Sequence, residues 1–568
     1  MKKLFTFRTI ILLMVVTNLF AQNKQTPPNL APYKVTWSQC FGGSDTDIGF
    51  SICEFDTSEL LVASYTSSKD ETITTPVFGN YDWWSMKFTH STTPQLVWSY
   101  TYGGSNYDKN RQTVPSYNHK SYVLFRTTHS KDGDVDHSQL PQGTKDNWWL
   151  VKINDAGTIL KQKLIVGAAS AESGGRALLP TSDNGYICLG WSNAQDNDFI
   201  GGYGFMDGWL FKVDSNLNIQ WRNHYGGSGT DAPIRLIRSG NYYYFTGETS
   251  SNNDDFKGQN HLDSTGHVTP DFGVWKTDTM GNLIWAKCPG GSGKEFPFDI
   301  HADWDGNIVC AGYTTSTDGD VTGYHGGSKD GWLFKLNASD GSLMWEKCFG
   351  GTSSDAIKRV LPMPDHGYLM LLTSASGDGD AVDAGKHQAD DVWLLRIDSN
   401  LNKMYGKMFG GSGSDQALDM QEFPGQGYII LATSTSCDGD LQGVKSLTSG
   451  EDDWLFFVTD SSLFSSGTAM KASADIVKTP KAIDPTSIVV YPSITSGPIS
   501  IQSVEPVSKT YTIRVVNTAG ELVWSKIMAD IKSPVNQNID LSQNPKGTYF
   551  VQILYGDSNK ETHKVTLE

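Results

Sequence analysis

The stretch Trp332–Asp355, WLFKLNASDGSLMWEKCFGGTSSD, contains the pattern that decides the fold. It reads as a strand, an Asp-Gly turn, a second strand, a pair of glycines and then an acidic residue. Short apolar runs bounded by Gly, Asp and Asn are typical of β-strands. The pattern returns along most of the 568-residue chain, so the sequence has to be read first as a set of repeats.

Two separate markers indicate the same number of repeats. The double glycine, or a degenerate copy of it, begins at Gly42, Gly103, Gly167, Gly226, Gly290, Gly350 and Gly410. A tryptophan in a strand-like segment occurs at Trp84, Trp149, Trp209, Trp275, Trp332, Trp393 and Trp454. Both series therefore predict seven repeats of about 60 residues each.

Each repeat is expected to contain four strands. In the sixth repeat these are 356–362, 367–374, 392–398 and 401–409, and no helical periodicity interrupts them. Four-stranded repeats in an all-β chain are typical of propeller blades, which bury their faces against neighbouring blades. We therefore predict an all-β fold with a seven-bladed β-propeller over residues 33–460.

The two ends of the repeat region predict how the ring closes. The last repeat stops at Asp460 without a fourth strand, whereas a lone strand at 34–41 precedes the first repeat. Trp37 in this strand matches the fourth-strand tryptophan of other repeats, such as Trp345. The N-terminal strand is thus expected to complete the seventh blade and to remove two exposed sheet edges.

Three further segments flank the propeller. Lys2, Lys3 and Arg8 precede an apolar run from Thr9 to Phe20, which predicts a secretory signal peptide over residues 1–21. No later apolar run has the length of a transmembrane helix. Residues 461–487 are rich in Ser, Ala, Lys and Thr and read as a linker, and residues 488–568 suit a small C-terminal β-sandwich.

Composition narrows the classes of partner. The formal net charge is −17, with the acidic excess between residues 22 and 460, which argues against binding to nucleic acid. Among the seven cysteines, Cys40, Cys288 and Cys348 share one repeat position, and Cys188 and Cys310 share another. Equivalent positions in different repeats lie too far apart to bridge. They are expected to be buried apolar residues rather than a disulfide framework.

The C-terminal segment resembles the sorting domain of the type IX secretion system of Bacteroidetes. The motifs are Val490-Tyr491-Pro492, Asn517-Thr518-Ala519-Gly520-Glu521, Ile539-Asp540-Leu541-Ser542, Gly547-Thr548-Tyr549-Phe550 and Lys564-Val565. The resemblance implies that the type IX machinery is a partner and that the protein is secreted or attached to the outer-membrane surface. The repeats themselves are similar to propeller repeats of secreted Bacteroidetes proteins, which implies a fold but no activity.

Acidic residues recur in the loop before each tryptophan strand. The candidate calcium ligands are Asp132, Asp134, Asp136, Asp196, Asp198, Asp318, Asp320, Asp378, Asp380, Asp438 and Asp440. Alternating carboxylates around a glycine suit a hard cation such as Ca²⁺, which is the one possible cofactor. The alternative is a turn in which Asp bonds its own backbone. Histidines in the same loops, His137, His261, His325 and His387, are either metal ligands or solvated side chains.

Four tryptophans fall outside the repeat pattern and the C-terminal domain. They are Trp83, Trp148, Trp191 and Trp304. Exposed aromatic rings beside polar groups would stack on a sugar or anchor a protein, whereas packing at blade edges is the alternative.

We predict that the protein is a secreted or cell-surface binding propeller, with a glycan or a protein as its ligand. No catalytic constellation is present in the sequence, and whether the protein is an enzyme is left open. One alternative is a secreted hydrolase or lyase with an acidic site at the propeller axis. Another is a purely structural surface protein.

Overall fold

The computed structural model describes most of the chain. In the first part it describes residues 35–56, 59–91, 93–117, 120–136, 138, 146–167, 171–259, 261–263, 265–423, 427–436, 438–441 and 453–460. In the C-terminal part of the chain it describes residues 488–491, 494–495, 498–506, 511–517, 522–528, 534–555 and 559–567. The chain divides into two compact units, Met1–Ala469 and Met470–Glu568. The predicted signal peptide and linker lie outside the described residues.

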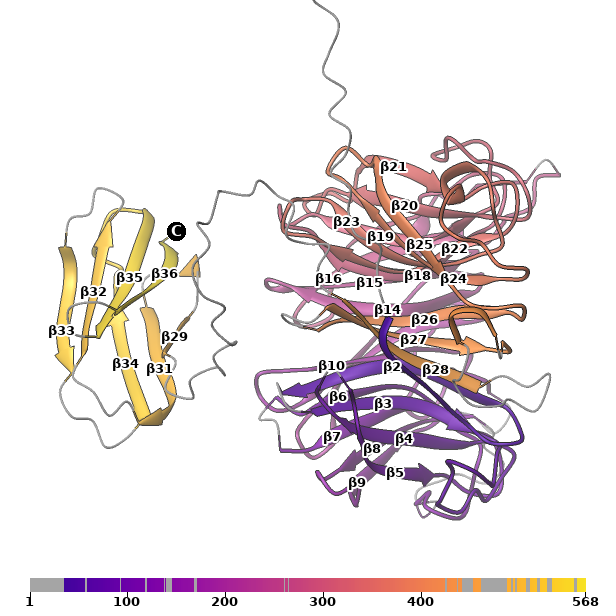
Figure 1. The fold of residues 1–568 in the computed structure, drawn as a ribbon, viewed down its shortest axis with the longest axis horizontal. Coiled ribbons are helices and arrows are strands. Elements are labelled where there is room, and N and C mark those ends of the chain that lie inside the picture. The colour runs from indigo at the N-terminus through magenta and orange to yellow at the C-terminus, as the bar shows by residue number, and fades with distance from the viewer. Residues whose placement is uncertain are drawn as a thin grey trace, which may run out of the picture. The chain divides into compact units, whose positions relative to one another are not determined.

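The first unit is built from four-stranded antiparallel sheets, and seven of them are described (Figure 1). The first three sheets contain β2 (Asp47–Asp56), β3 (Glu59–Thr66), β4 (Asp82–Thr89) and β5 (Leu96–Tyr102); β6 (Asp108–Pro115), β7 (Tyr122–Thr128), β8 (Asn147–Ile153) and β9 (Ile159–Ile165); and β10 (Ser173–Pro180), β11 (Tyr186–Ser192), β12 (Asp207–Val213) and β13 (Ile219–Tyr225).

The next three sheets repeat this order of strands. They contain β14 (Asp231–Ser239), β15 (Tyr242–Thr249), β16 (Asp271–Asp278) and β17 (Leu283–Lys287); β18 (Glu295–Ala302), β19 (Ile308–Thr314), β20 (Asp330–Leu336) and β21 (Leu343–Phe349); and β22 (Asp355–Pro362), β23 (Tyr368–Ser374), β24 (Asp391–Ile397) and β25 (Lys403–Phe409). The strands of this sixth repeat agree with the expected ones to within two residues at each end.

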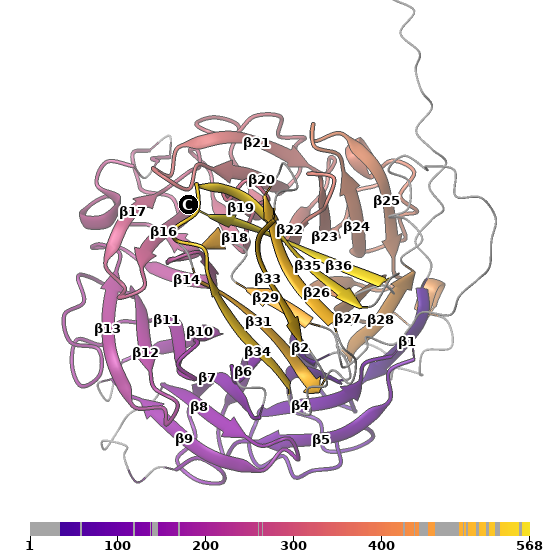
Figure 2. The ribbon, with the colours of Figure 1, turned by 90° about the vertical axis from the view of Figure 1, so that its left-hand side faces the viewer.

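The remaining sheet joins the two ends of the repeat region. It contains β26 (Asp415–Phe423), β27 (Gly427–Ser434), β28 (Asp453–Asp460) and β1 (Val35–Phe41), and β1 pairs antiparallel with β28. Figure 2 shows the first strand of each sheet facing a common centre, with the fourth strands at the periphery. The fold of this unit is that of a β-propeller.

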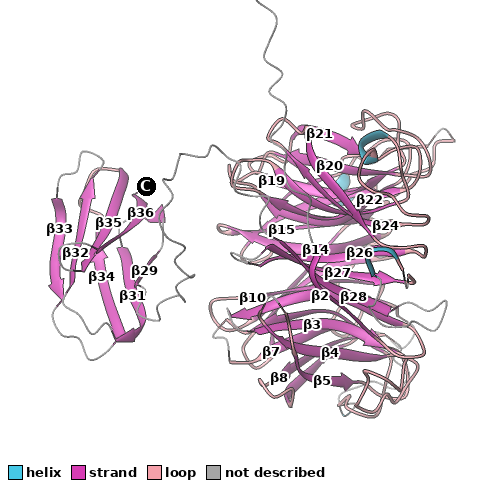
Figure 3. Cartoon of the chain, in the orientation of Figure 1, coloured by secondary structure: helices cyan, strands magenta, loops and turns pink. Residues whose placement is uncertain are grey.

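Helix is almost absent, as predicted for an all-β chain (Figure 3). The described helical turns are three short 3-10 turns, η2 (Asp254–Phe256), η3 (Gly379–Ala381) and η4 (Gly439–Leu441). No helix in the described part of the chain is long and apolar enough to cross a membrane.

Neighbouring sheets bury their faces against each other. One apolar cluster joins Val309 and Leu333 of one sheet to Ile357 and Met370 of the next, and all four are fully buried. The third-strand tryptophans Trp84, Trp149, Trp209, Trp275, Trp332 and Trp393 are likewise at most 1% exposed. Burial of large apolar side chains on both faces of a sheet is what stabilises a repeat that has no core of its own.

Six of the cysteines are buried, as expected: Cys40, Cys53, Cys188, Cys288, Cys310 and Cys348. Cys437 lies outside the described residues.

The second unit consists of two sheets that share one apolar core. One contains β29 (Ile488–Tyr491), β31 (Pro498–Pro506) and β34 (Pro534–Asp540). The other contains β30 (Ile494–Thr495), β36 (Asn559–Leu567), β35 (Gly547–Tyr555), β32 (Tyr511–Asn517) and β33 (Leu522–Met528). Ile501 and Ile539 of the first sheet pack in the same cluster as Val515 and Val551 of the second.

Candidate functional site

The Asp-Gly-Asp loops are bound to the double-glycine turns on the same side of the propeller. Asp378 accepts hydrogen bonds from the Thr352 amide at 2.8 Å and from the Thr352 hydroxyl at 2.7 Å. The Asp380 carboxylate accepts one from the Gly350 amide at 3.3 Å, and the Asp380 amide donates to the Gly350 carbonyl at 2.8 Å. The loop between the second and third strands thereby fixes the turn through which the chain enters the sheet.

The same use of the carboxylates recurs in other repeats. In each case a carboxylate accepts a backbone amide of the double-glycine turn or its equivalent. The donor and acceptor pairs are Ser105 and Asp132, Gly103 and Asp134, Val166 and Asp198, Ser292 and Asp318, Gly290 and Asp320, and Ser412 and Asp438. Asp136 accepts the Ser138 amide, Asp196 accepts the Asn197 side-chain amide, and the Asp440 amide donates to the Gly410 carbonyl.

This geometry does not fit a calcium site. Ca²⁺ needs six to eight oxygen ligands that converge on one point, whereas the carboxylates of a pair are turned toward separate amide donors. Within the described residues, no three His, Cys, Asp or Glu side chains gather in a group that could hold a metal ion. The turn alternative accounts for these hydrogen bonds.

Calcium is therefore expected to leave the stability of the propeller unchanged. Calcium at 100 times its dissociation constant would add about 2.7 kcal/mol to the free energy of unfolding. Thermal unfolding in millimolar CaCl₂ and in EDTA checks this, with MgCl₂ at equal ionic strength as the control. A rise in Tm of several degrees that is specific to calcium would contradict the prediction.

The loop histidines are not gathered around one centre. The Nδ1 atoms of His261, His325 and His387 lie 2.9, 2.8 and 3.0 Å from the buried carboxylates of Asp271, Asp330 and Asp391 in their own repeats. The expectation of solvated loop histidines is wrong for these three, because each caps a buried aspartate. His137 lies outside the described residues.

Buried carboxylates lie at every described double glycine. Asp355, which is fully buried, accepts the Gly351 amide at 3.0 Å and the hydroxyls of Ser374 and Ser376 at 2.5 and 2.6 Å. The equivalent acid in five other repeats accepts the corresponding glycine amide. These acids are Asp47, Asp108, Asp231, Glu295 and Asp415. These acids bond loop amides in repeat after repeat, and they hold the fold rather than a ligand.

Two of the four candidate tryptophans are fully buried, so their predicted role as exposed binding residues is wrong. Trp83 packs on Trp149 with ring centroids 4.3 Å apart. Trp148 packs edge-to-face against Phe125, Phe199 and Phe211. Both rings belong to apolar cores between sheets and have no surface to offer a ligand.

The other two tryptophans occupy different surroundings. Trp304 is 55% exposed in the turn between β18 and β19, with the His366 ring as a neighbour 6.5 Å away. Trp191, on β11, is partly buried and lines a cavity of about 350 Å³. Of the four candidates, Trp191 is the one that meets a cavity.

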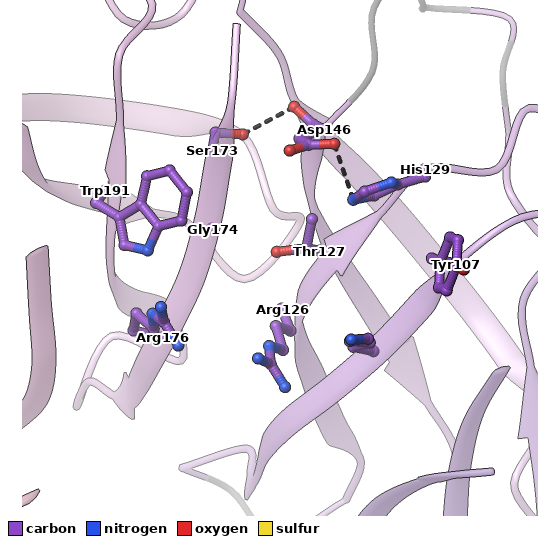
Figure 4. Close-up of a pocket in the computed structure, with 10 residues that line it drawn as sticks. Tyr107, Arg126, Thr127, His129, Asp146, Ser173, Gly174, Arg176 and Trp191 are labelled. Atoms are coloured by element: carbon purple, nitrogen blue, oxygen red, sulfur yellow. Dashed lines mark hydrogen bonds and ion pairs between the residues drawn. The ribbon is translucent and has the colours of Figure 1, made fainter. Parts of the chain in front are cut away.

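This cavity, which we call the Trp191 cleft, lies between two neighbouring sheets. Its lining residues are Tyr107, Lys109, Arg126, Thr127, His129, Asp146, Ser173, Gly174, Arg176 and Trp191. Figure 4 shows Trp191 and Arg176 on one wall and Thr127, His129 and Tyr107 on the other. Gly174 makes room for the indole, because a Cβ atom there would lie 2.9 Å from the Trp191 ring.

The cleft combines positive charge with aromatic rings. The Arg176 guanidinium lies 5.9 Å from the centroid of the Trp191 ring, and the Lys109 ammonium lies 5.9 Å from that of Tyr107. Burial, together with Arg176, lowers the pKa of Arg126 to about 9, and burial lowers that of Arg176 to about 10. One terminal nitrogen of Arg126, the Arg176 Nε and the Trp191 Nε1 are buried without a partner within the described residues.

The acidic residue of the cleft is paired. The Asp146 carboxylate lies 2.8 Å from His129 Nε2, and the Asp146 carbonyl accepts the Ser173 hydroxyl at 2.8 Å (Figure 4). Within the described residues no ion pair joins Lys109, Arg126 or Arg176 to a carboxylate, so an anionic ligand would meet positive charge in the cleft.

A second cavity, of about 230 Å³, lies where the first strands meet, and we call it the axial cavity. It is lined by Phe50, Arg111, Gln112, Arg176, Ile234, Arg235, Phe296, Phe298, Lys358, Arg359, Ala417 and Leu418. Arg176 also lines the Trp191 cleft, so the two cavities share a wall. The predicted acidic site at the axis is wrong, because arginine and lysine line this cavity.

A backbone irregularity places these side chains at the axis. Each first strand has a shift of register at the same place, and the residues within the shifts are Phe50, Arg111, Arg176, Ile234, Phe298, Lys358 and Leu418. All seven line the axial cavity. A β-bulge redirects one side chain away from the sheet, and sequence reasoning missed the repeated bulge.

A family model for a secretion system C-terminal sorting domain matches residues 489–568. No curated protein sequence matches the chain. Among solved structures, a periplasmic gluconolactonase of Pseudomonas aeruginosa shares 11% identity at a TM-score of 0.38, covering 65% of this chain and 88% of its own. The structure of YCF48 bound to a D1 peptide shares 8% identity at a TM-score of 0.39, and the match covers 76% of this chain and 96% of that one. A subtype N10 neuraminidase-like protein from a bat influenza virus shares 7% identity at a TM-score of 0.33, and the match covers 75% of this chain and 100% of that one.

The fold and the sorting domain together define a secreted β-propeller protein. The sorting domain indicates an extracellular or cell-surface location and implies an interaction with the type IX secretion machinery. The likeness to solved structures is too low to carry an argument about the ligand.

Proposed function

We propose that the protein is a binding protein of the cell exterior that holds an acidic glycan in the Trp191 cleft. The observation that carries this proposal is the unpaired Arg126 and Arg176 beside a partly exposed indole in one cavity. A sugar ring stacks on an aromatic face, and a carboxylate or sulfate on the sugar pairs with a guanidinium. A volume of about 350 Å³ suits a small part of a longer chain.

The scaffold for this site is a closed ring of seven blades. The pairing of β1 with β28 supports closure, and so does the Asp419 carboxylate of β26, which accepts the Ile52 amide of β2 at 2.9 Å. Phe41 of β1 and Ile429 of β27 also belong to the same apolar cluster as Leu60 of β3. A closed ring holds the walls of the cleft at a fixed distance, which preorganises the site.

Replacing Trp191 by Ala is expected to weaken binding of a uronic acid-containing oligosaccharide by about tenfold or more, because an aromatic anchor contributes about 2 kcal/mol at a binding site. Trp304→Ala is the matched control, since Trp304 is exposed in a turn between the first and second strands, away from the cleft. Isothermal titration with acidic and neutral oligosaccharides measures both variants. Equal affinity of the two variants, or a preference for neutral sugars, would contradict the proposal.

A second candidate function is elimination on an acidic polysaccharide in the same cleft. The His129–Asp146 pair at 2.8 Å favours it, because the pair provides a proton acceptor beside Arg126. The histidine would take the proton at C5 of a uronate, the C4–C5 double bond would form, and the C4–O bond would break as the leaving oxygen takes a proton from water. Ultraviolet absorbance of the unsaturated product tests it, with His129→Ala as the inactive variant. No product with wild-type protein excludes this function and leaves the binding proposal intact.

The titration with oligosaccharides also separates the proposed function from a protein ligand and from a purely structural surface role. A protein ligand would bury exposed loop residues around the cleft and would not require the cleft to distinguish acidic from neutral sugars. A structural surface protein would bind neither kind of sugar in a saturable way.

A further inference from the structure

The axial cavity gathers more positive charge than its carboxylates neutralise. Arg111, Arg176, Arg235, Lys358 and Arg359 line it. Asp419 lies 2.5 Å from Arg359 and 3.6 Å from Arg235, and Asp299 lies 3.5 Å from Arg235. No carboxylate lies within ion-pair distance of Arg111, Arg176 or Lys358 in the described part of the propeller.

The two carboxylates already bond backbone amides of neighbouring sheets. Asp299 accepts the Val360 amide of the next sheet at 2.9 Å, and Asp419 accepts the Ile52 amide at 2.9 Å. They therefore hold neighbouring first strands together and are not free to move toward the unpaired cations. Gln112 makes the same contact with the Leu178 amide at 2.8 Å.

The unpaired cations repel one another across the axial cavity. Burial and the neighbouring Arg176, Arg126, Arg235 and Arg359 lower the pKa of Arg111 well below its usual range. Burial and the charges of Lys329 and Arg359 lower the pKa of Lys358 to about 7. The Lys358 ammonium lies 3.8 Å from the centroid of Phe298, so a ring rather than a carboxylate is its neighbour. Like charges this close are tolerated when an anion neutralises them.

We infer that the axial cavity is a binding site for an oxyanion, a carboxylate, sulfate or phosphate group, held by Arg111, Arg176 and Lys358. The guanidinium groups bind two oxygens of such an anion side by side, and Lys358 adds a point charge. Phe50, Phe296 and Phe298 restrict water around the bound group. The site is distinct from the Trp191 cleft, although the two share Arg176, and it does not depend on the proposed glycan.

The test is a titration of the full-length protein with sodium phosphate, sodium sulfate and sodium citrate, each against sodium chloride at equal ionic strength. Saturable binding of at least one of these anions is expected, and the three arms identify the favoured group. Arg111→Met is expected to weaken that binding by about tenfold or more. Arg238→Met is the control of equal charge, since Arg238 is exposed and donates to the Gly240 carbonyl.

Stability measurements keep the inference falsifiable if a variant folds poorly. Without an anion, Arg111→Met is expected to raise Tm, because one unpaired cation is removed; with the anion, the wild type should gain Tm and the variant should not. Trp191→Ala should retain anion binding, which separates this site from the glycan site. Absence of saturable binding by all three anions, or a loss of Tm in Arg111→Met that is the same with and without anion, would overturn the inference.

Discussion

Asp355→Ala is expected to lower the free energy of unfolding of the propeller by about 3 kcal/mol or more, because buried donors left without an acceptor cost about 1–3 kcal/mol each. The Asp355 carboxylate accepts the Gly351 amide and two serine hydroxyls in a fully buried site. The variant would leave all three donors facing an apolar gap. Unfolding in denaturant, followed by tryptophan fluorescence, measures the change.

Asp378→Ala provides the matched control for this prediction. Asp378 also accepts an amide and a hydroxyl of one turn, but it is only partly buried and both hydrogen bonds lie at the surface, so water can replace its oxygens. Its loss is expected to cost about 1 kcal/mol. If Asp378→Ala proved as destabilising as Asp355→Ala, the buried carboxylates would not be what fixes the double-glycine turns.

The propeller is expected to become more stable as the pH falls from 8 to about 5. Burial raises the pKa of Asp82 to about 7, that of Glu295 to about 7 and those of Asp47, Asp207 and Asp255 to about 6. The native state therefore binds more protons than the unfolded state in this range, so its stability falls as the pH rises through these values. For Asp82, about three pKa units correspond to about 4 kcal/mol if it titrates alone.

The same sign holds for a loop histidine. The opposite sign applies to Lys358, whose lowered pKa acts above about pH 7, and to Asp183 in acid. The hydrogen bond to Asp271 raises the pKa of His261, so its contribution is also lost as the pH rises. Asp183, bound by Lys212 and Thr181, has its pKa lowered to about 2 although burial opposes this, so its contribution is lost below about pH 4. Stability should thus peak at mildly acidic pH.

Thermal unfolding between pH 4 and pH 9 measures this profile, and Asp82→Asn is the variant that tests its cause. The second repeat carries Asn147 where β4 carries Asp82 at the start of the third strand, which indicates that an amide fits there. The variant is expected to be more stable than the wild type at pH 8 and to have a flatter profile. A Tm that decreases steadily from pH 8 to pH 5 would contradict the account of the buried acids.

The repeated features of this fold could be predicted from the sequence because the same motif occurs in several repeats. The strands β20 and β21 lie within Asp330–Phe349, and the glycines and acid that follow form the passage to the next sheet. The pairing partner of β1 was also predictable, since one repeat lacked a strand that the N-terminus supplied.

The burial of Trp83 was misjudged because adjacent strand residues point to opposite faces of a sheet. Trp84 belongs to the repeat pattern and Trp83 falls outside it, so Trp83 was a candidate for an exposed binding residue. Neighbouring sheets cover both faces of each sheet here, so both rings are buried. The same reasoning explains Trp148 beside Trp149.

The axial cations were missed because their signal lies in a departure from repeat symmetry. In the regular repeats, the bulge residue stands eight positions after the first glycine of the pair, as Arg111 follows Gly103 and Lys358 follows Gly350. The identity of this residue changes from repeat to repeat while the turns around it do not. The Trp191 cleft offered no such signal, because its walls come from separate sheets.

The measurement that tests the central claim most directly is the structure of the full-length protein bound to a uronic acid-containing oligosaccharide. The account predicts a sugar ring against Trp191 with its carboxylate within hydrogen-bond distance of Arg126 or Arg176. A bound sugar at Trp304 or at another surface, with the Trp191 cleft left open at a saturating concentration, would contradict it.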